Sequence, residues 1–112
     1  MKLVTAVVQL GKLDEVAHAV AAAGAGGLTA TEVRGFGQQY GHRAADRPAD
    51  AKVVVVAKLR IEVLISDERA WPVAEAIAKA VRTGTIGDGK IWISPVEGAL
   101  RVRTGERDLA AL

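Results

Sequence analysis

The chain has 112 residues, half of them apolar, a formal net charge of +2 and no cysteine. This length and apolar content predict one folded domain and exclude a chain that is disordered throughout. The absence of cysteine excludes disulfides, thiolate metal sites and thiol catalysis. Basic and acidic residues are evenly mixed, and the four aromatic residues do not cluster into a base-stacking platform, so we expect no nucleic-acid partner.

No apolar run approaches the roughly 20 residues that cross a bilayer, and no signal-peptide pattern opens the sequence. The longest apolar run, VVVVA at residues 53–57, has the length of a strand. We therefore expect a soluble protein of the cytoplasm.

In the first half of the chain a strand pattern is followed by a helix pattern and a second strand. Residues 2–9 are rich in β-branched side chains and predict a buried strand. Residues 12–23 follow a helical period, with carboxylates in the first turn and one apolar stripe made by Leu13, Val16, Ala17 and Val20. Glycines from Gly24 onward end this helix, and residues 28–36 predict the second strand.

The second half repeats this order. Residues 58–66 predict a strand, and a helix is expected over 67–82 with Ser66 or Asp67 as its cap. Pro72 is compatible with that helix only within about its first turn. Residues 91–96 predict the fourth strand, and residues 99–103 a short extended piece. The repeat predicts the α+β ferredoxin-like order β-α-β-β-α-β, an antiparallel sheet with helices on one face and right-handed crossovers.

Two loops interrupt this framework. Residues 35–52, GFGQQYGHRAADRPADAK, are either a surface loop without a role or a protruding contact arm, and their unusual length favours the arm. Residues 83–90, TGTIGDGK, fit G-x-x-x-x-G-K, but Ile91 and a strand follow where a P-loop has Ser or Thr and a helix. This second loop is either a helix stop with a turn or a glycine-rich anion site. Arg101 and Arg103, alternating on the expected last strand, would present two guanidinium groups on one face and favour phosphate binding.

Three motifs together resemble the PII nitrogen-regulatory signal proteins. They are GFG-x-Q-x-GH at residues 35–42, RTGTIGDGKI at 82–91 and RVRTGE at 101–106, and the resemblance is nearly collinear over residues 1–112. It implies a single PII-like domain that forms a homotrimer, with nucleotide sites between subunits where ATP and ADP compete. It also implies 2-oxoglutarate binding beside ATP through Mg²⁺, and no chemistry beyond slow ATP turnover.

The resemblance also implies a role for each segment and site residue. A long loop over residues 35–57 would dock on a target through residues 37–55, residues 82–90 would form the phosphate loop, and residues 98–112 a C-terminal loop. The expected nucleotide-binding residues are Thr29, Gly37, Gln38, Glu62, Leu64, Gly87, Asp88, Gly89, Lys90, Arg101 and Arg103. Among them, Thr29 and Leu64 would border the adenine, and Glu62 would orient Lys90 as its ion partner. The arginines would come from the adjacent subunit's side of the cleft.

The metal and acid sites would share residues. The side-chain oxygen of Gln39 would bind Mg²⁺, and Gln39, Gly41 and Lys58 would bind 2-oxoglutarate. A hard cation that keeps most of its ligands from phosphate and substrate suits such a site. For Lys58 and Glu62, an exposed strand face is the simpler alternative.

The sequence departs from the family mainly in the long loop. Ala51 stands where many members carry a nucleotidylated tyrosine, and Ala49 where others carry a phosphorylated serine, so we expect no modification at the tip. The VVVVA run is more apolar than the family pattern, and would either extend the third strand or supply a sticky flank for a partner. Gln9, Leu10 and Gly11 replace a basic and aromatic pattern, and Gln38 stands where a basic residue is common.

These departures leave the target open. It would be an ammonium transporter or a nitrogen-metabolism enzyme or regulator; alternatively, a divergent PII-like protein would serve another transport system, such as metal efflux or bicarbonate uptake. A slow nucleotide hydrolase is the alternative from another class, but no carboxylate pair or activated nucleophile stands near the phosphate loop. His18 and His42 lack the nearby ligands of a metal site.

Overall fold

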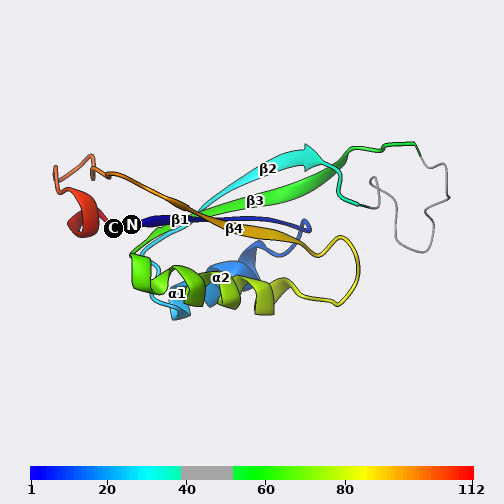
Figure 1. Cartoon of the computed structure of the whole chain (residues 1–112), viewed down its shortest axis with the longest axis horizontal. Helices are drawn as coiled ribbons and strands as arrows, with labels where there is room; N and C mark the ends of the chain where they lie inside the picture. Colours follow the sequence, from blue (N-terminus) through cyan, green and yellow to red (C-terminus); the bar gives the residue numbers. More distant parts are fainter. Residues whose placement is uncertain (39–51) are drawn as a thin grey trace.

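Four antiparallel strands form one sheet, and two helices cover one of its faces (Figure 1). The computed structural model describes residues 1–38 and 52–112. Its elements are β1 (Lys2–Val8), α1 (Leu13–Ala22), β2 (Thr29–Gly35), β3 (Val56–Ile65), α2 (Asp67–Val81), β4 (Gly89–Pro95) and a 3₁₀ turn over Asp108–Ala111. The strand order is β2-β3-β1-β4, which confirms the expected ferredoxin-like α+β fold.

The core lies between the helices and the sheet face that they cover. Alternate residues of β1 and β3 point to this face and are fully or almost fully buried, as the period of two requires. The helices contribute mainly valine, isoleucine and alanine, including Val16 and Val20 of α1 and Val73 and Ile77 of α2. Leu13, expected in the stripe of α1, is instead 40% exposed because it is the first residue of the helix.

No helix of the described residues covers the opposite face of the sheet, and its side chains stand in rows across the strands. Val7 of β1 lies opposite both Arg60 of β3 and Lys90 of β4. In the next row, Thr5 lies opposite Glu62 and Trp92, and Glu62 also lies opposite Thr29 at the start of β2. Polar, charged and aromatic side chains therefore share this open face of the sheet.

The ends of the two helices agree with the sequence-based expectations only in part. Gly24 takes a φ of +96° after α1, a conformation that suits glycine. Ser66 occupies the N-cap position of α2 but makes no side-chain capping bond. The expectation for Pro72 is wrong, since Pro72 is inside α2 beyond its first turn. A proline there lacks the N–H that would donate to the carbonyl of Glu68, an exposed residue of the first turn.

One expectation about extended segments is confirmed in part, and another is wrong. β3 begins at Val56, so Val56 and Ala57 of the VVVVA run extend the strand expected from residue 58, whereas Val53–Val55 precede it and are 42–52% exposed. Residues 99–103 are not a strand, because residues 102–104 form a turn and only Leu100 and Arg107 bridge. The backbone N–H of Arg101 donates to the carbonyl of Glu106 at 2.9 Å, which closes this segment on itself.

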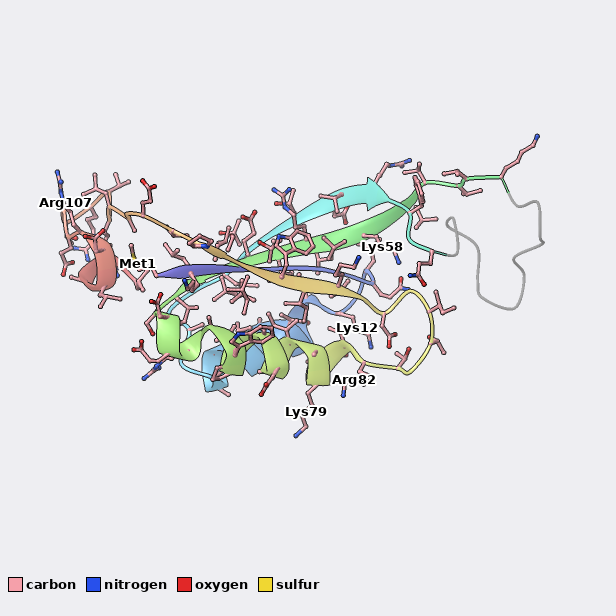
Figure 2. All side chains as sticks on the ribbon, in the orientation of Figure 1. Met1, Lys12, Lys58, Lys79, Arg82 and Arg107 are labelled. Carbon is pink, nitrogen blue, oxygen red and sulfur yellow. The ribbon has the colours of Figure 1, made fainter. Side chains whose placement is uncertain are left out.

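The N-terminus is fastened to α2. The Met1 ammonium donates a hydrogen bond to Asp67 Oδ1 at 2.7 Å, at the first residue of the helix. Figure 2 shows Met1 at the same end of the molecule as Arg107, away from Lys58. Within residues 1–38 and 52–112, no helix combines the length and apolar character that a membrane span needs.

Candidate functional site

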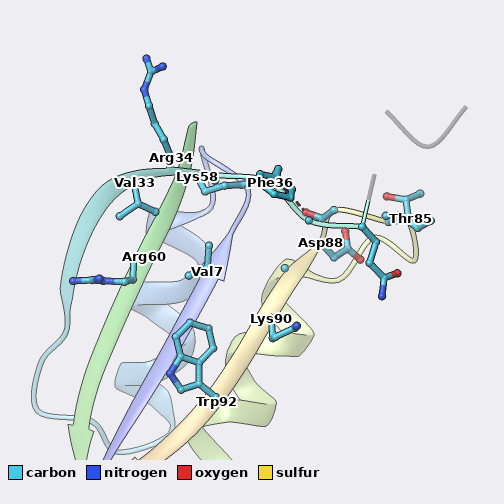
Figure 3. A pocket seen from close by; sticks show the side chains of 16 residues that line it. Val7, Val33, Arg34, Phe36, Lys58, Arg60, Thr85, Asp88, Lys90 and Trp92 are labelled. Carbon is cyan, nitrogen blue, oxygen red and sulfur yellow. Dashed lines mark hydrogen bonds between the residues drawn. The ribbon is translucent and has the colours of Figure 1, made fainter. Parts of the chain in front are cut away.

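A cavity of about 670 Å³ opens where β2 ends and β4 begins. Its walls come from the end of β2 and the residues after it, from β3, and from the loop between α2 and β4 (Figure 3). The lining residues are Val7, Val33, Arg34, Gly35, Phe36, Gly37, Gln38, Lys58, Arg60, Thr85, Ile86, Gly87, Asp88, Gly89, Lys90 and Trp92. The cavity therefore joins two of the three motifs that stand far apart in the sequence.

The loop between α2 and β4 is shaped by glycines with positive φ. Gly84, Gly87 and Gly89 have φ values of +87°, +104° and +120°, which side chains with a Cβ rarely adopt. At Gly89 a Cβ would also overlap the carbonyl oxygen of Val7. Glycine is required here because β4 passes directly against the backbone of β1.

The carboxylate of Asp88 fastens this loop from within. It accepts hydrogen bonds from the backbone N–H of Thr83 at 2.7 Å, from the backbone N–H of Gly84 at 2.9 Å and from the Thr83 hydroxyl. These bonds, the Thr83 hydroxyl first, lower the pKa of Asp88. Since its charge is already satisfied inside the loop, Asp88 is placed to shape the loop rather than to meet a ligand with its carboxylate.

Three cations of the open sheet face meet at the cavity. Lys58 is nearly buried at 9% exposure, and its Nζ lies 3.4 Å from the carbonyl oxygen of Gly87. Arg60 and Lys90 stand in one row across β1, and both line the cavity. Arg34 contributes to the wall, but Figure 3 shows its guanidinium pointing away from the other labelled side chains. Nearby positive charges beside a glycine-rich loop suit a polyanion.

Part of the expected site lines the cavity. Seven residues predicted from the sequence line it, namely Gly37, Gln38, Lys58, Gly87, Asp88, Gly89 and Lys90. Thr29, Glu62 and Leu64 lie further along the open face and do not line it. Gln39 and Gly41, as well as Tyr40 and His42, lie outside the described residues.

The expected ion pair between Glu62 and Lys90 is replaced by another. Glu62 Oε1 lies 3.2 Å from Arg60 Nη2, because both side chains are on the same face of β3, two residues apart. Glu62 lies opposite Thr5 of β1, whereas Lys90 lies opposite Val7, one row away. The carboxylate of Glu62 therefore orients Arg60 within this chain.

Arg101 and Arg103 lie away from the cavity of their own chain. Figure 1 places the C-terminal segment at the end of the molecule opposite to the loop between α2 and β4. Arg101 donates from Nη2 to the carbonyl of Leu112 at 2.8 Å, and its buried Nε lies 3.8 Å from Glu106 Oε1, an ion pair without a hydrogen bond to any described residue. Arg103 follows in an exposed turn, so the two guanidinium groups do not alternate on a strand as expected.

Sequence reasoning missed several residues of this region. Arg60 and Trp92 line the cavity, and Trp92 is 46% exposed on the open face. Their position two residues after Lys58 and Lys90 on strands was the signal that could have identified them. Gln9 was noted only as a departure, yet its side chain contacts the carbonyl of Gly87.

The described residues do not form a hydrolytic or metal site of their own. Among the described residues that line the cavity, Asp88 is the only one with a carboxylate, and that carboxylate is hydrogen-bonded within the loop. Across residues 1–38 and 52–112 there is no cluster of three or more potential metal-binding side chains. His18 is exposed on α1, where its Nδ1 lies 2.7 Å from the carbonyl of Asp14.

Known proteins resemble this chain over its full length. A family model described as nitrogen regulatory protein P-II matches residues 1–106. The nitrogen regulatory protein P-II of Cereibacter sphaeroides is 51% identical over 106 residues, which make up 95% of each chain. Nitrogen regulatory protein GlnK of Escherichia coli (strain K12) is 45% identical, and nitrogen regulatory protein P-II of Nostoc punctiforme 46% identical, each over 112 residues and the whole of both chains.

Proposed function

Because the chain belongs to the nitrogen regulatory protein P-II family, whose members are signal transducers and not enzymes, we propose that it senses ATP, ADP and 2-oxoglutarate for a target protein. The bound state would reach that target through the long loop over residues 35–57. ATP, ADP and 2-oxoglutarate would thus act as effectors that the protein binds and releases.

The observation that carries this proposal is the cavity at the ends of β2 and β4. Lys58, Arg60 and Lys90 line it, beside a loop whose glycines have positive φ. A polyphosphate would pair with these cations and receive hydrogen bonds from loop amides, and charge-assisted bonds of this kind are among the stronger ones in proteins. Gly37 and Gln38 would lie along the same phosphates from the opposite wall.

The acid effector would bind next to the nucleotide. Lys58 is the natural partner of one carboxylate of 2-oxoglutarate, since it is a nearly buried cation whose present contact, at 3.4 Å, is weak. Gln39 would complete the coordination of a Mg²⁺ ion held mainly by ATP and the acid, and the backbone of Gly41 would lie beside the acid.

The remaining predicted residues would act in a homotrimer of this 1–112 domain. The open sheet face, with Trp92 46% exposed, is an interface candidate. A neighbouring subunit could bring its C-terminal loop, residues 98–112, and with it Arg101 and Arg103, to the phosphate loop at residues 82–90. Thr29, Glu62 and Leu64 would then border the adenine part of the site.

The target would be an ammonium transporter or a nitrogen-metabolism enzyme or regulator of the cytoplasm, contacted by residues 37–55. The exposed valines at 53–55 favour a second candidate, a client in another transport system such as metal efflux or bicarbonate uptake, because they give this loop an apolar flank. With alanine at positions 49 and 51, control would come from ligands alone.

Calorimetry of 2-oxoglutarate binding tests the proposal. We expect heat of binding only when Mg²⁺ and ATP are both present, and tight binding to the nucleotide-free protein would contradict the proposed metal site. Lys58→Met should weaken acid binding roughly 30-fold or more, because it removes one side of a buried charge pair, and should leave ATP affinity within a few-fold. Lys79→Met, the same exchange on the exposed side of α2 (Figure 2), is the matched control.

A further inference from the structure

Gln9 touches the phosphate loop from a position that lines no part of the cavity. It directly follows the last residue of β1, Val8, and its side chain is half-buried. Its Nε2 donates a hydrogen bond to the carbonyl oxygen of Gly87 at 2.7 Å. This distance is at the short end of the range for N–H···O bonds, so Gln9 is a well-placed donor to the backbone of the loop.

Lys58 shares the same acceptor. Its Nζ lies 3.4 Å from the Gly87 carbonyl oxygen, a longer and weaker contact than that of Gln9. A carbonyl oxygen has two lone pairs and can accept both donors at once. The Gly87 carbonyl is therefore held by one neutral donor and by one cation that also lines the cavity.

The strand register brings these three residues together. Val8 lies opposite Leu59 on one side and opposite Gly89 on the other. One step beyond Val8 along β1 is Gln9, and one step before Leu59 along β3 is Lys58. Gly87, two residues before Gly89, turns back over them with its φ of +104°. The shared acceptor is thus a consequence of the paired strand ends.

We propose that Gln9 is a positioning residue that couples the two ligand sites. Its amide fixes the direction of the Gly87 carbonyl and maintains it when Lys58 leaves that carbonyl for an anionic ligand. This inference rests on the proposed function, because it assumes that Lys58 moves to a carboxylate of the acid effector.

The physical reason is the cost of a carbonyl without a donor. In the wild type, the departure of Lys58 leaves the bond from Gln9 in place. Without the amide of Gln9, the same departure leaves a partly buried acceptor unpaired, which disfavours the movement of Lys58. A freed carbonyl could also turn toward the phosphates and repel them. Gln9 should therefore set the factor by which nucleotide and acid strengthen each other's binding, a factor that is the same in both directions.

Two substitutions of Gln9 test separately the loss of the hydrogen-bond donor and the introduction of a negative charge. Gln9→Met removes the amide at nearly constant length, and Gln9→Glu replaces the donor by an anion that repels the Gly87 carbonyl and attracts Lys58. Glu75→Met, on the exposed side of α2, is a matched control for an added methionine. The measurements are amide hydrogen exchange of residues 84–89 without ligand, the affinity for Mg-ATP, and the change of that affinity at saturating 2-oxoglutarate.

For Gln9→Met we expect exchange in the loop to accelerate, and Mg-ATP affinity to fall, by roughly two- to tenfold each, the range of one net hydrogen bond. The strengthening of ATP binding by the acid should fall by roughly fivefold or more, as expected for an unpaired acceptor. Gln9→Glu should weaken acid binding more than ATP binding. Glu75→Met should match the wild type.

Wild-type loop exchange and wild-type coupling in Gln9→Met would overturn the inference. A wild type that binds neither ligand would instead refute the proposed function. In that case the exchange measurement still decides whether Gln9 positions the loop, because it needs no ligand: unchanged exchange refutes it, and faster exchange confined to residues 84–89 supports it.

Discussion

Gly89 is the position in the cavity wall where one added methyl group should be most damaging. Its φ is +120°, and a Cβ built there would overlap the carbonyl oxygen of Val7 and lie 3.0 Å from the Cα of Val8. Both atoms belong to the backbone of β1 in the middle of the sheet, so neither can move without moving the strand. Gly89→Ala therefore tests whether this loop depends on the close approach of β4 to β1.

The expected loss of stability follows from two costs. A residue with a Cβ in a sparsely populated backbone region costs about 1–3 kcal/mol. To relieve the overlap, β4 must move away from β1 and loosen the pairs of Val8 with Gly89 and of Val7 with Lys90, at about 1 kcal/mol for each net hydrogen bond. The free energy of unfolding should therefore fall by at least about 3 kcal/mol, which in a domain of this size lowers the thermal midpoint on the order of 10–20 °C.

The assay is thermal and urea unfolding of matched glycine variants at one protein concentration. Gly84→Ala and Gly105→Ala have positive φ, +87° and +72°, but no atom within 4 Å of the added Cβ, so each should cost only about 1 kcal/mol. Gly35→Ala has neither feature and should resemble the wild type. If Gly89→Ala were no less stable than Gly84→Ala, the argument from close approach would be refuted.

The remaining predictions concern two carboxylates and one exposed valine. The hydrogen bond and the charge of the Met1 ammonium lower the pKa of Asp67, so its contribution to stability is present above about pH 4 and is lost as the pH falls through the lowered pKa. Asp67→Asn should accordingly lower the thermal midpoint at neutral pH, and the difference from the wild type should vanish in acid; a difference independent of pH would contradict this. The pKa of Asp88 is also lowered, first by the hydrogen bond from the Thr83 hydroxyl. Asp88→Asn should therefore speed amide exchange in residues 83–88 at neutral pH. Exchange equal to the wild type would show that the carboxylate does not hold the loop. Val54→Lys should lower the light scattering of the protein, because it places a charge in an exposed apolar run that can promote self-association. Equal scattering from both proteins would show that this run does not promote self-association.

The sequence predicted the framework because its signals are local. Apolar alternation located the strands, a helical period located α1 and α2, and Gly24 marked a helix end with the expected positive φ. The boundaries moved where pairing rather than composition decides them: β4 begins at Gly89 because Gly89 still lies opposite Val8. Residues 99–103 alternate like a strand, but none of the described strands pairs with them, and they turn back on themselves instead.

The cavity residues that were predicted came from the phosphate-loop motif and from the family resemblance. Gly87, Gly89 and Lys90 belong to that motif, Lys58 came from the resemblance, and all four line one cavity. Arg60 and Glu62 were not predicted as a pair, because their ion pair depends on two side chains of β3 leaning toward each other. Gln9 belongs to no motif of its own. Its contact with Gly87 arises between residues 78 positions apart, which no local pattern can indicate.

The register of β1 explains why these distant residues form one site. Val7 and Val8 each pair with β3 on one side and β4 on the other, so a single strand fixes where both neighbours end. A shift of β3 by one residue against β1 would turn Lys58 and Arg60 toward the helices and bring Leu59 and Ile61 to the open face. Such a shift would bury two charges in an apolar core, so the free energy that holds the core together also holds the cations at the cavity. The fold and the cation-lined cavity therefore depend on the same strand pairing, and the two glycine-rich segments complete a cavity whose cations the sheet positions.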